Sequence, residues 1–69
     1  MATKRVVVQG GGKNLYRISI YESKHTVSQV DVGYFTNDIN VIGEARNMDD
    51  ALSILKAHSR KSIKKITDW

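Results

Sequence analysis

The segment GEARNMDDALSILKAH, residues 43–58, decides the fold class of this chain because it describes the start and the buried side of a helix. Asn47 stands at the N-cap position, where its side-chain oxygen can accept a hydrogen bond from a free N–H of the first turn. Asp49 and Asp50 follow and place negative charge at the positive end of the helix dipole. The pattern predicts a helix that begins at Met48.

One side of this helix is apolar. The residues that recur at the i, i+3, i+4 and i+7 spacing of a buried stripe are Met48, Ala51, Leu52 and Leu55. Lys56 and His58 then supply the positive charge that a helix C-terminus prefers. We therefore expect one principal helix over about residues 48–59.

The chain before the helix alternates between apolar and polar residues, as half-buried strands do. In the clearest case, Tyr16, Ile18 and Ile20 point one way, and Arg17, Ser19 and Tyr21 point the other. The expected strands are 5–9, 15–22, 27–35 and 39–45, with polar connections between them and with residues 1–4 frayed. In the fourth strand, the small residues Gly43 and Ala45 should let the helix approach closely.

The segment after the helix permits two structures. A helix continued to residue 67 keeps Ile63 and Ile66 in register with the apolar stripe. At 1.5 Å per residue it would be about 30 Å long, whereas strands of this size span only about 23 Å, so both isoleucines and Trp69 would be exposed. A fifth strand over 62–68 covers them within the same molecule, and the composition of the segment favours it.

The fold class expected is α+β: an antiparallel meander of four or five short strands with one principal helix on one face, in a single domain of residues 1–69. Three consecutive valines leave the register of the first strand open. The expected core consists of Val6 or Val7, Tyr16, Ile18, Ile20, Val30, Val32, Val41, Ala51, Leu52 and Leu55.

Composition limits the functions of so small a chain. The 69 residues include no cysteine, which excludes disulfides and thiolate metal sites. His25 and His58 are far apart and have no ligand-like neighbours, so we expect no metal and no cofactor. No apolar run approaches the ~18 residues of a membrane span, and the three valines after Arg5 are far short of a signal peptide. We expect a cytoplasmic protein without membrane contact, for which self-association remains a way to stabilise a small core.

The formal net charge of +4 is concentrated near the C-terminus. Five basic residues lie within ten positions that contain no acid: Lys56, Arg60, Lys61, Lys64 and Lys65. Such a cluster can neutralise phosphates of a nucleic acid or of another polyanion. It can equally be a solvated surface that keeps a small protein soluble.

Aromatic residues give a second candidate surface. Tyr21 and Phe35 fall on strand faces opposite those of Tyr16 and Tyr34, which we expect in the core. With Trp69 they form the expected interaction surface, suited to a protein partner.

No catalytic group of residues can be assembled. The glycine-rich segment 9–14 lacks the Lys-Ser/Thr pair and the following helix of a phosphate loop, and predicts a hairpin turn. Asp49 and Asp50 are adjacent, so on a helix they point about 100° apart and form no carboxylate pair. We expect no enzyme, no catalytic residue and no small-molecule substrate.

The expected function is that of a small binding or accessory protein that contacts nucleic acid or another polyanion through residues 56–65. The alternative is a protein-interaction module that acts as a homodimer or as a subunit of a larger complex.

Overall fold

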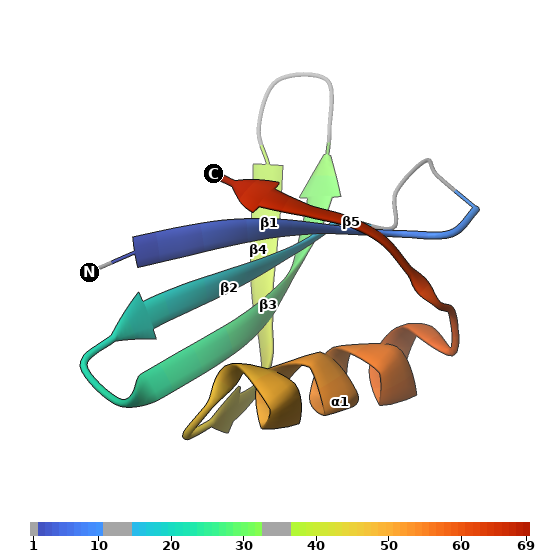
Figure 1. Cartoon of the computed structure of the whole chain (residues 1–69). Coiled ribbons are helices and arrows are strands. Elements are labelled where there is room, and N and C mark those ends of the chain that lie inside the picture. Colours follow the sequence, from blue (N-terminus) through green and yellow to red (C-terminus); the bar gives the residue numbers. More distant parts are fainter. Residues whose placement is uncertain (1, 11–14, 33–36) are drawn as a thin grey trace.

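A computed structural model describes residues 2–10, 15–32 and 37–69 of the chain. It contains five antiparallel strands and one helix (Figure 1). Their bounds are β1 (Ala2–Val8), β2 (Leu15–Tyr21), β3 (Lys24–Val32), β4 (Asn37–Ala45), α1 (Met48–Ser59) and β5 (Ile63–Asp68). The α+β fold, with four strands before the helix and one after it, is confirmed.

The strand order in the sheet is β4-β3-β2-β1-β5. After the helix the chain returns to the far side of β1, so the first and last strands lie side by side (Figure 1). Residues 1–4 were expected to be frayed, but β1 already begins at Ala2, which pairs with Ile20, and Lys4 pairs with Asp68. The pairing with β5 on one side and β2 on the other orders this end of the chain.

Local capping explains why α1 covers Met48–Ser59, as predicted. The Asn47 side chain accepts a hydrogen bond of 2.8 Å from the backbone N–H of Asp50. At the other end Arg60 adopts a left-handed conformation (φ 58°), and its N–H donates to the Lys56 carbonyl at 2.7 Å. The left-handed residue ends the helix and lets the chain turn back as β5.

The core lies between α1 and one face of the sheet. Its buried members are Val6, Val8, Tyr16, Ile18, Val27, Ala51 and Leu55. Ile20 and Leu52, which were expected in the core, are only partly buried against it, while Val8 and Val27 were not expected there. The alternation in β1 thus turns Val6 and Val8 toward the helix and Val7 away from it. The side chain of Val32 lies outside the described residues.

The expectation that Val41 is a core residue is wrong, because its side chain is 63% exposed. The cause is an irregularity in the β3–β4 ladder: Val27 pairs with Gly43, but the next residue, Ser28, pairs with Val41. Ile42 is therefore an extra residue in β4, and such a bulge reverses the facing of the residues before it. Gly43 stays on the helix side, where an added Cβ would lie 3.0 Å from Cγ2 of Ile54, as close an approach as predicted.

The C-terminal segment is a strand and not a continued helix. Ile63 is half-buried, whereas Ile66 and Trp69 remain 43% and 46% exposed. The strand alternative is therefore confirmed, but of its two isoleucines only Ile63 packs against the core. β3 also begins earlier than predicted, at Lys24, because Glu22 adopts a positive φ of 56° in a short turn.

Candidate functional site

The sheet face opposite α1 carries two arginines at its centre. Strand pairing places one row of residues across all five strands, in the order Thr67, Arg5, Arg17, Ser28, Val41. Because side chains alternate between faces, Arg5, next to the buried Val6, points away from the helix. Arg17 lies between the buried Tyr16 and Ile18 and points the same way. We call this side of the sheet the open face.

Trp69 lies against these arginines. The Arg5 guanidinium carbon is 4.8 Å from the centroid of the Trp69 ring, and that of Arg17 is 5.8 Å from it. Both distances are in the range of cation–π attraction. The backbone N–H of Trp69 donates to the Thr3 carbonyl at 3.0 Å, which continues the β5–β1 pairing to the end of the chain. The indole is thus held on the sheet, with 46% of its surface exposed.

Among the described residues, neither guanidinium group forms an ion pair with a carboxylate. The ion pairs among the described residues are Lys4–Asp68 and Lys24–Glu44, and neither involves Arg5 or Arg17. Within the same residues the Nε of Arg17 is buried without a hydrogen-bond partner. Like charges directly opposite each other on neighbouring strands are destabilising. In the described part of the chain, the open face therefore concentrates positive charge and the unpaired Nε–H of Arg17 around one aromatic ring.

An apolar row lies beside the arginines on the open face. It begins at Lys65 on β5 and continues through Val7, Leu15, Val30 and Ile39. Val30 is 1% exposed, yet it does not belong to the core cluster under the helix. Ile39 and Val41, at the β4 end of the face, are 41% and 63% exposed. The face thus combines a cationic and aromatic half with an apolar half.

The five basic residues predicted from the sequence are divided between the end of α1, the following turn and β5. Lys56 is exposed on α1, Arg60 is the helix C-cap, and Lys61 lies in the turn before β5. In β5, Lys65 pairs with Val7 on the open face, while Lys64 falls at an irregularity between Lys65 and Ile63. Of these five basic residues, only Lys65 lies on the open face near Arg5 and Arg17.

The predicted aromatic surface is placed only in part. Tyr21 is 60% exposed, and the alternation of β2 puts it on the open face with Arg17. Trp69 lies on the same face. Phe35 lies outside the described residues.

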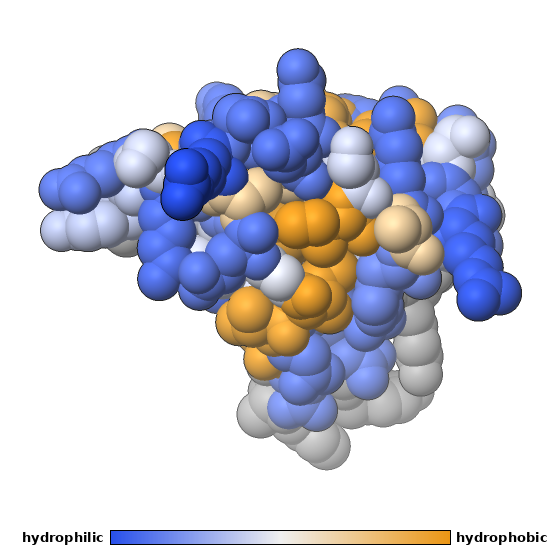
Figure 2. Space-filling model, turned by 90° about the horizontal axis from the view of Figure 1, so that it is seen from below, coloured by the Kyte–Doolittle hydropathy of each residue, from blue (hydrophilic) through white to orange (hydrophobic). Residues whose placement is uncertain are grey.

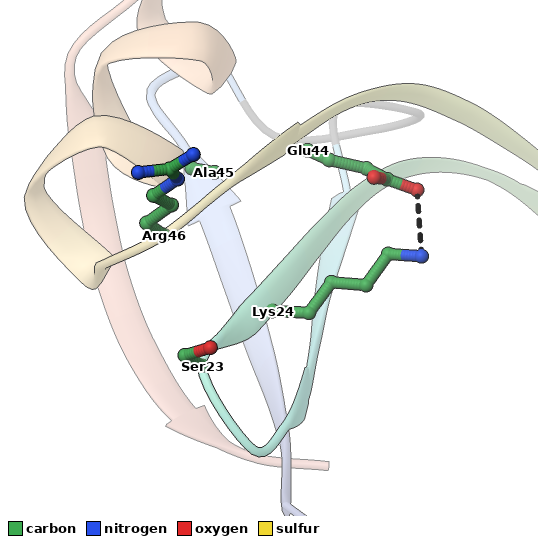
Figure 3. Close-up of a pocket in the computed structure, with 5 residues that line it drawn as sticks. All are labelled: Ser23, Lys24, Glu44, Ala45 and Arg46. Atoms are coloured by element: carbon green, nitrogen blue, oxygen red, sulfur yellow. Dashed lines mark ion pairs between the residues drawn. The ribbon is translucent and has the colours of Figure 1, made fainter.

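A polar pocket lies at one end of β4 (Figure 3). It is lined by Ser23, Lys24, Glu44, Ala45 and Arg46. Lys24 forms an ion pair with Glu44, with Nζ 3.3 Å from Oε1, and in Figure 3 the two side chains point toward each other, away from Ser23. Because the lysine and the carboxylate are already paired with each other, the pocket offers a ligand only Arg46 and Ser23.

Two further side-chain contacts stabilise the fold, one between β1 and β5 and one on the helix side of the sheet. Lys4 and Asp68 form an ion pair across β1 and β5, and this hydrogen bond to Lys4 lowers the pKa of Asp68. On the helix side the Tyr16 hydroxyl and Nδ1 of His58 are 2.9 Å apart. Burial raises the pKa of Tyr16, so the hydroxyl stays protonated.

The helix side is less suited to an anion. Figure 2 shows this side with an apolar area at its centre, bordered by polar residues. Partly buried Ile42, Leu52 and Ile54 pack against the core there. Within the described ranges, no three His, Asp or Glu side chains stand close enough together to hold a metal ion. No helix in the same ranges has the length and apolar character to cross a membrane.

Comparisons with protein families, with curated proteins and with solved structures find no match to this chain. The site must therefore be interpreted from its own geometry. Sequence reasoning placed Arg17 on the face opposite Tyr16 but did not select Arg5 or Arg17 as site residues. The alternation of apolar and polar residues in β2 could have identified Arg17 as a residue of the open face. Its position next to Arg5 and Trp69 depends on the order of the strands, which no short stretch of sequence indicates.

Proposed function

We propose that this protein binds nucleic acid through the open face of its sheet, with Arg5, Arg17, Lys65 and Trp69 as the contact residues. The observation that carries the proposal is the placement of Arg5 directly opposite Arg17 without a carboxylate among the described residues. This arrangement costs folding energy in the free protein. Phosphate groups would supply the missing negative charge and would accept hydrogen bonds from both guanidinium groups.

The remaining basic residues support this role from the edge of the sheet. Lys61 is exposed in the turn before β5, Lys64 is exposed in β5 next to Lys65, and Lys56 is exposed on α1. In this proposal they raise the local positive potential and speed the encounter with a polyanion, but they do not define the contact surface. The protein is a binding protein in this account, not an enzyme.

The test is binding of a fluorescently labelled oligonucleotide, followed by anisotropy between about 50 and 200 mM salt. Affinity should fall steeply with salt. In the variant Arg5→Gln/Arg17→Gln the loss of two phosphate contacts should reduce the slope of log K against log salt by about 1.5. The matched control is Arg46→Gln/Arg60→Gln, which removes the same number of positive charges outside the open face and should change the slope little.

Absence of salt-dependent binding to any oligonucleotide would refute the proposal. Equal effects of the open-face double substitution and the control double substitution would also refute it, because both remove the same charge and differ only in position. Far-UV circular dichroism and a urea transition would confirm that each variant is folded.

A second candidate function is self-association through the edge of β4. This strand of nine residues pairs only with β3 in the described sheet. Proteins protect free edges with lysine or proline, and β5 carries Lys64 and Lys65, but β4 carries neither residue type. Its exposed Ile39 and Val41 would pair with the same residues of a second copy in a two-fold dimer.

Light scattering over a range of protein concentration tests this second candidate. A dimer that becomes a monomer in the Val41→Lys variant would support it. A monomer at every concentration would refute it.

A further inference from the structure

We infer that the open face takes single-stranded rather than double-stranded nucleic acid, with one base stacked on the exposed surface of the Trp69 indole. The inference rests on the proposed function and adds the class of nucleic acid and the mode of contact. Three features of the open face lead to it: the shape of the face, the position of the indole and the apolar row.

Among the described residues, no helix projects from the open face. Duplex DNA is read by a helix or a two-stranded ribbon that enters the major groove. The one described helix, α1, packs on the opposite side of the sheet (Figure 1). Arg5 lies on β1 and Arg17 on the central strand β2, so both arginines are inside the sheet and not on a projecting loop. A single strand whose bases are splayed out can lie across such a surface.

The indole of Trp69 is positioned to stack. Proteins that bind single strands combine a basic surface for the phosphates with aromatic rings for the bases. Here both parts are in contact, since the guanidinium carbon of Arg5 lies 4.8 Å from the ring centroid. The hydrogen bond from the Trp69 N–H to the Thr3 carbonyl fixes the backbone at Trp69. Binding therefore costs less conformational entropy at this residue. The 46% of Trp69 that is exposed is the surface offered to a base.

The apolar row offers a contact surface for an unstacked base, which a single strand has and a duplex lacks. Val7 and Leu15 are paired neighbours on β1 and β2, directly beside the paired Arg5 and Arg17. Both are partly exposed. A base that leaves a single strand exposes an apolar ring surface that packs on such side chains, while the bases of a duplex remain stacked inside it. Phosphates at the arginines and bases at Trp69 and the apolar row thus fit one strand.

The experiment follows the fluorescence of Trp69, the only tryptophan, during titration of the unmodified protein. The probes are single-stranded oligo(dT) and oligo(U) of about 12 nucleotides, a duplex of equal length, and heparin as a polyanion without bases. Both single strands should quench the emission and bind more tightly than the duplex. Heparin should bind through charge alone and should leave the emission nearly unchanged.

Two variants measure the stacking contact. Trp69→Leu should weaken single-strand binding by about 5- to 150-fold, the loss expected for one stacked base. Trp69→Phe keeps an aromatic ring and should recover most of the affinity. A proportional loss of heparin binding in Trp69→Leu would indicate a disturbed arginine site instead and would contradict the stacking contact.

The outcomes separate this inference from the proposed function. If nothing binds with salt dependence, the proposed function fails, and the inference fails with it. If the duplex binds as tightly as the single strands, or if single strands bind without quenching Trp69, nucleic-acid binding stands and the single-strand inference is overturned.

Discussion

Replacing His58 with alanine should destabilise this domain more than removing the hydroxyl of its partner, Tyr16. The Tyr16 side chain is 2% exposed, and its hydroxyl lies 2.9 Å from Nδ1 of His58. His58 itself is exposed, so it can turn to water when the hydroxyl is removed. The Tyr16 side chain is almost fully buried, so its hydroxyl has much less access to water.

The expected magnitudes follow from this asymmetry. In Tyr16→Phe the net value of one hydrogen bond is lost, about 0.5–1.5 kcal/mol. In His58→Ala a buried hydroxyl is left without its partner, which costs about 1–3 kcal/mol. The total stability of a chain of this size is about 3–10 kcal/mol, so either change is measurable. When His58→Ala is made in the Tyr16→Phe protein, it should cost less than about 1 kcal/mol, because no hydroxyl remains to be left unpaired.

The assay is urea denaturation of the four proteins of this double-mutant cycle, followed by far-UV circular dichroism. Equal costs for His58→Ala in the two backgrounds would refute the reasoning. A Tyr16→Phe protein less stable than His58→Ala would refute it as well.

Three further predictions concern the fold. Gly43→Ala should destabilise by about 1–3 kcal/mol in thermal or urea unfolding, because its Cβ would lie 3.0 Å from Cγ2 of Ile54, and an Ile54→Ala background should remove most of that cost. The side chain of Asp68, followed by NMR, should titrate below its ordinary pKa and return toward it in Lys4→Met; since the folded-state pKa is lowered, the ion pair contributes stability above the unfolded-state pKa and loses it as the pH falls through the folded-state value. Deletion of residues 62–69 should abolish the cooperative unfolding transition because it removes the β5 partner of β1; a truncated chain that melts like the full one would contradict the role given to β5.

The features that depend on neighbouring residues were predictable from the sequence. The helix bounds follow from the Asn47 cap and the apolar spacing after it, and the facing of Tyr16 and Ile18 follows from strict alternation. The facing of Val41 was not predictable in this way. It depends on one extra residue in β4, and a bulge reverses the facing without changing the composition of the strand.

The open face depends on contacts between distant residues. Arg5 and Trp69 are separated by almost the whole chain and meet only because β5 returns to pair with β1. The sequence placed the basic residues of 56–65 together, but the end of α1 at Arg60 divides them between helix, turn and strand. A local count of charge therefore does not identify the two arginines that strand pairing brings beside Trp69.

The most direct test of the central claim uses the four arginines of the chain. In a titration of the labelled protein with a single-stranded oligonucleotide, NMR resolves the Nε–H signals of the arginines and the indole N–H of Trp69. We predict that Arg5, Arg17 and Trp69 shift together and saturate at the same oligonucleotide concentration, while Arg46 and Arg60 shift little. Shifts confined to Arg46 and Arg60, with Arg5, Arg17 and Trp69 unchanged, would contradict the assignment of the open face as the nucleic-acid site.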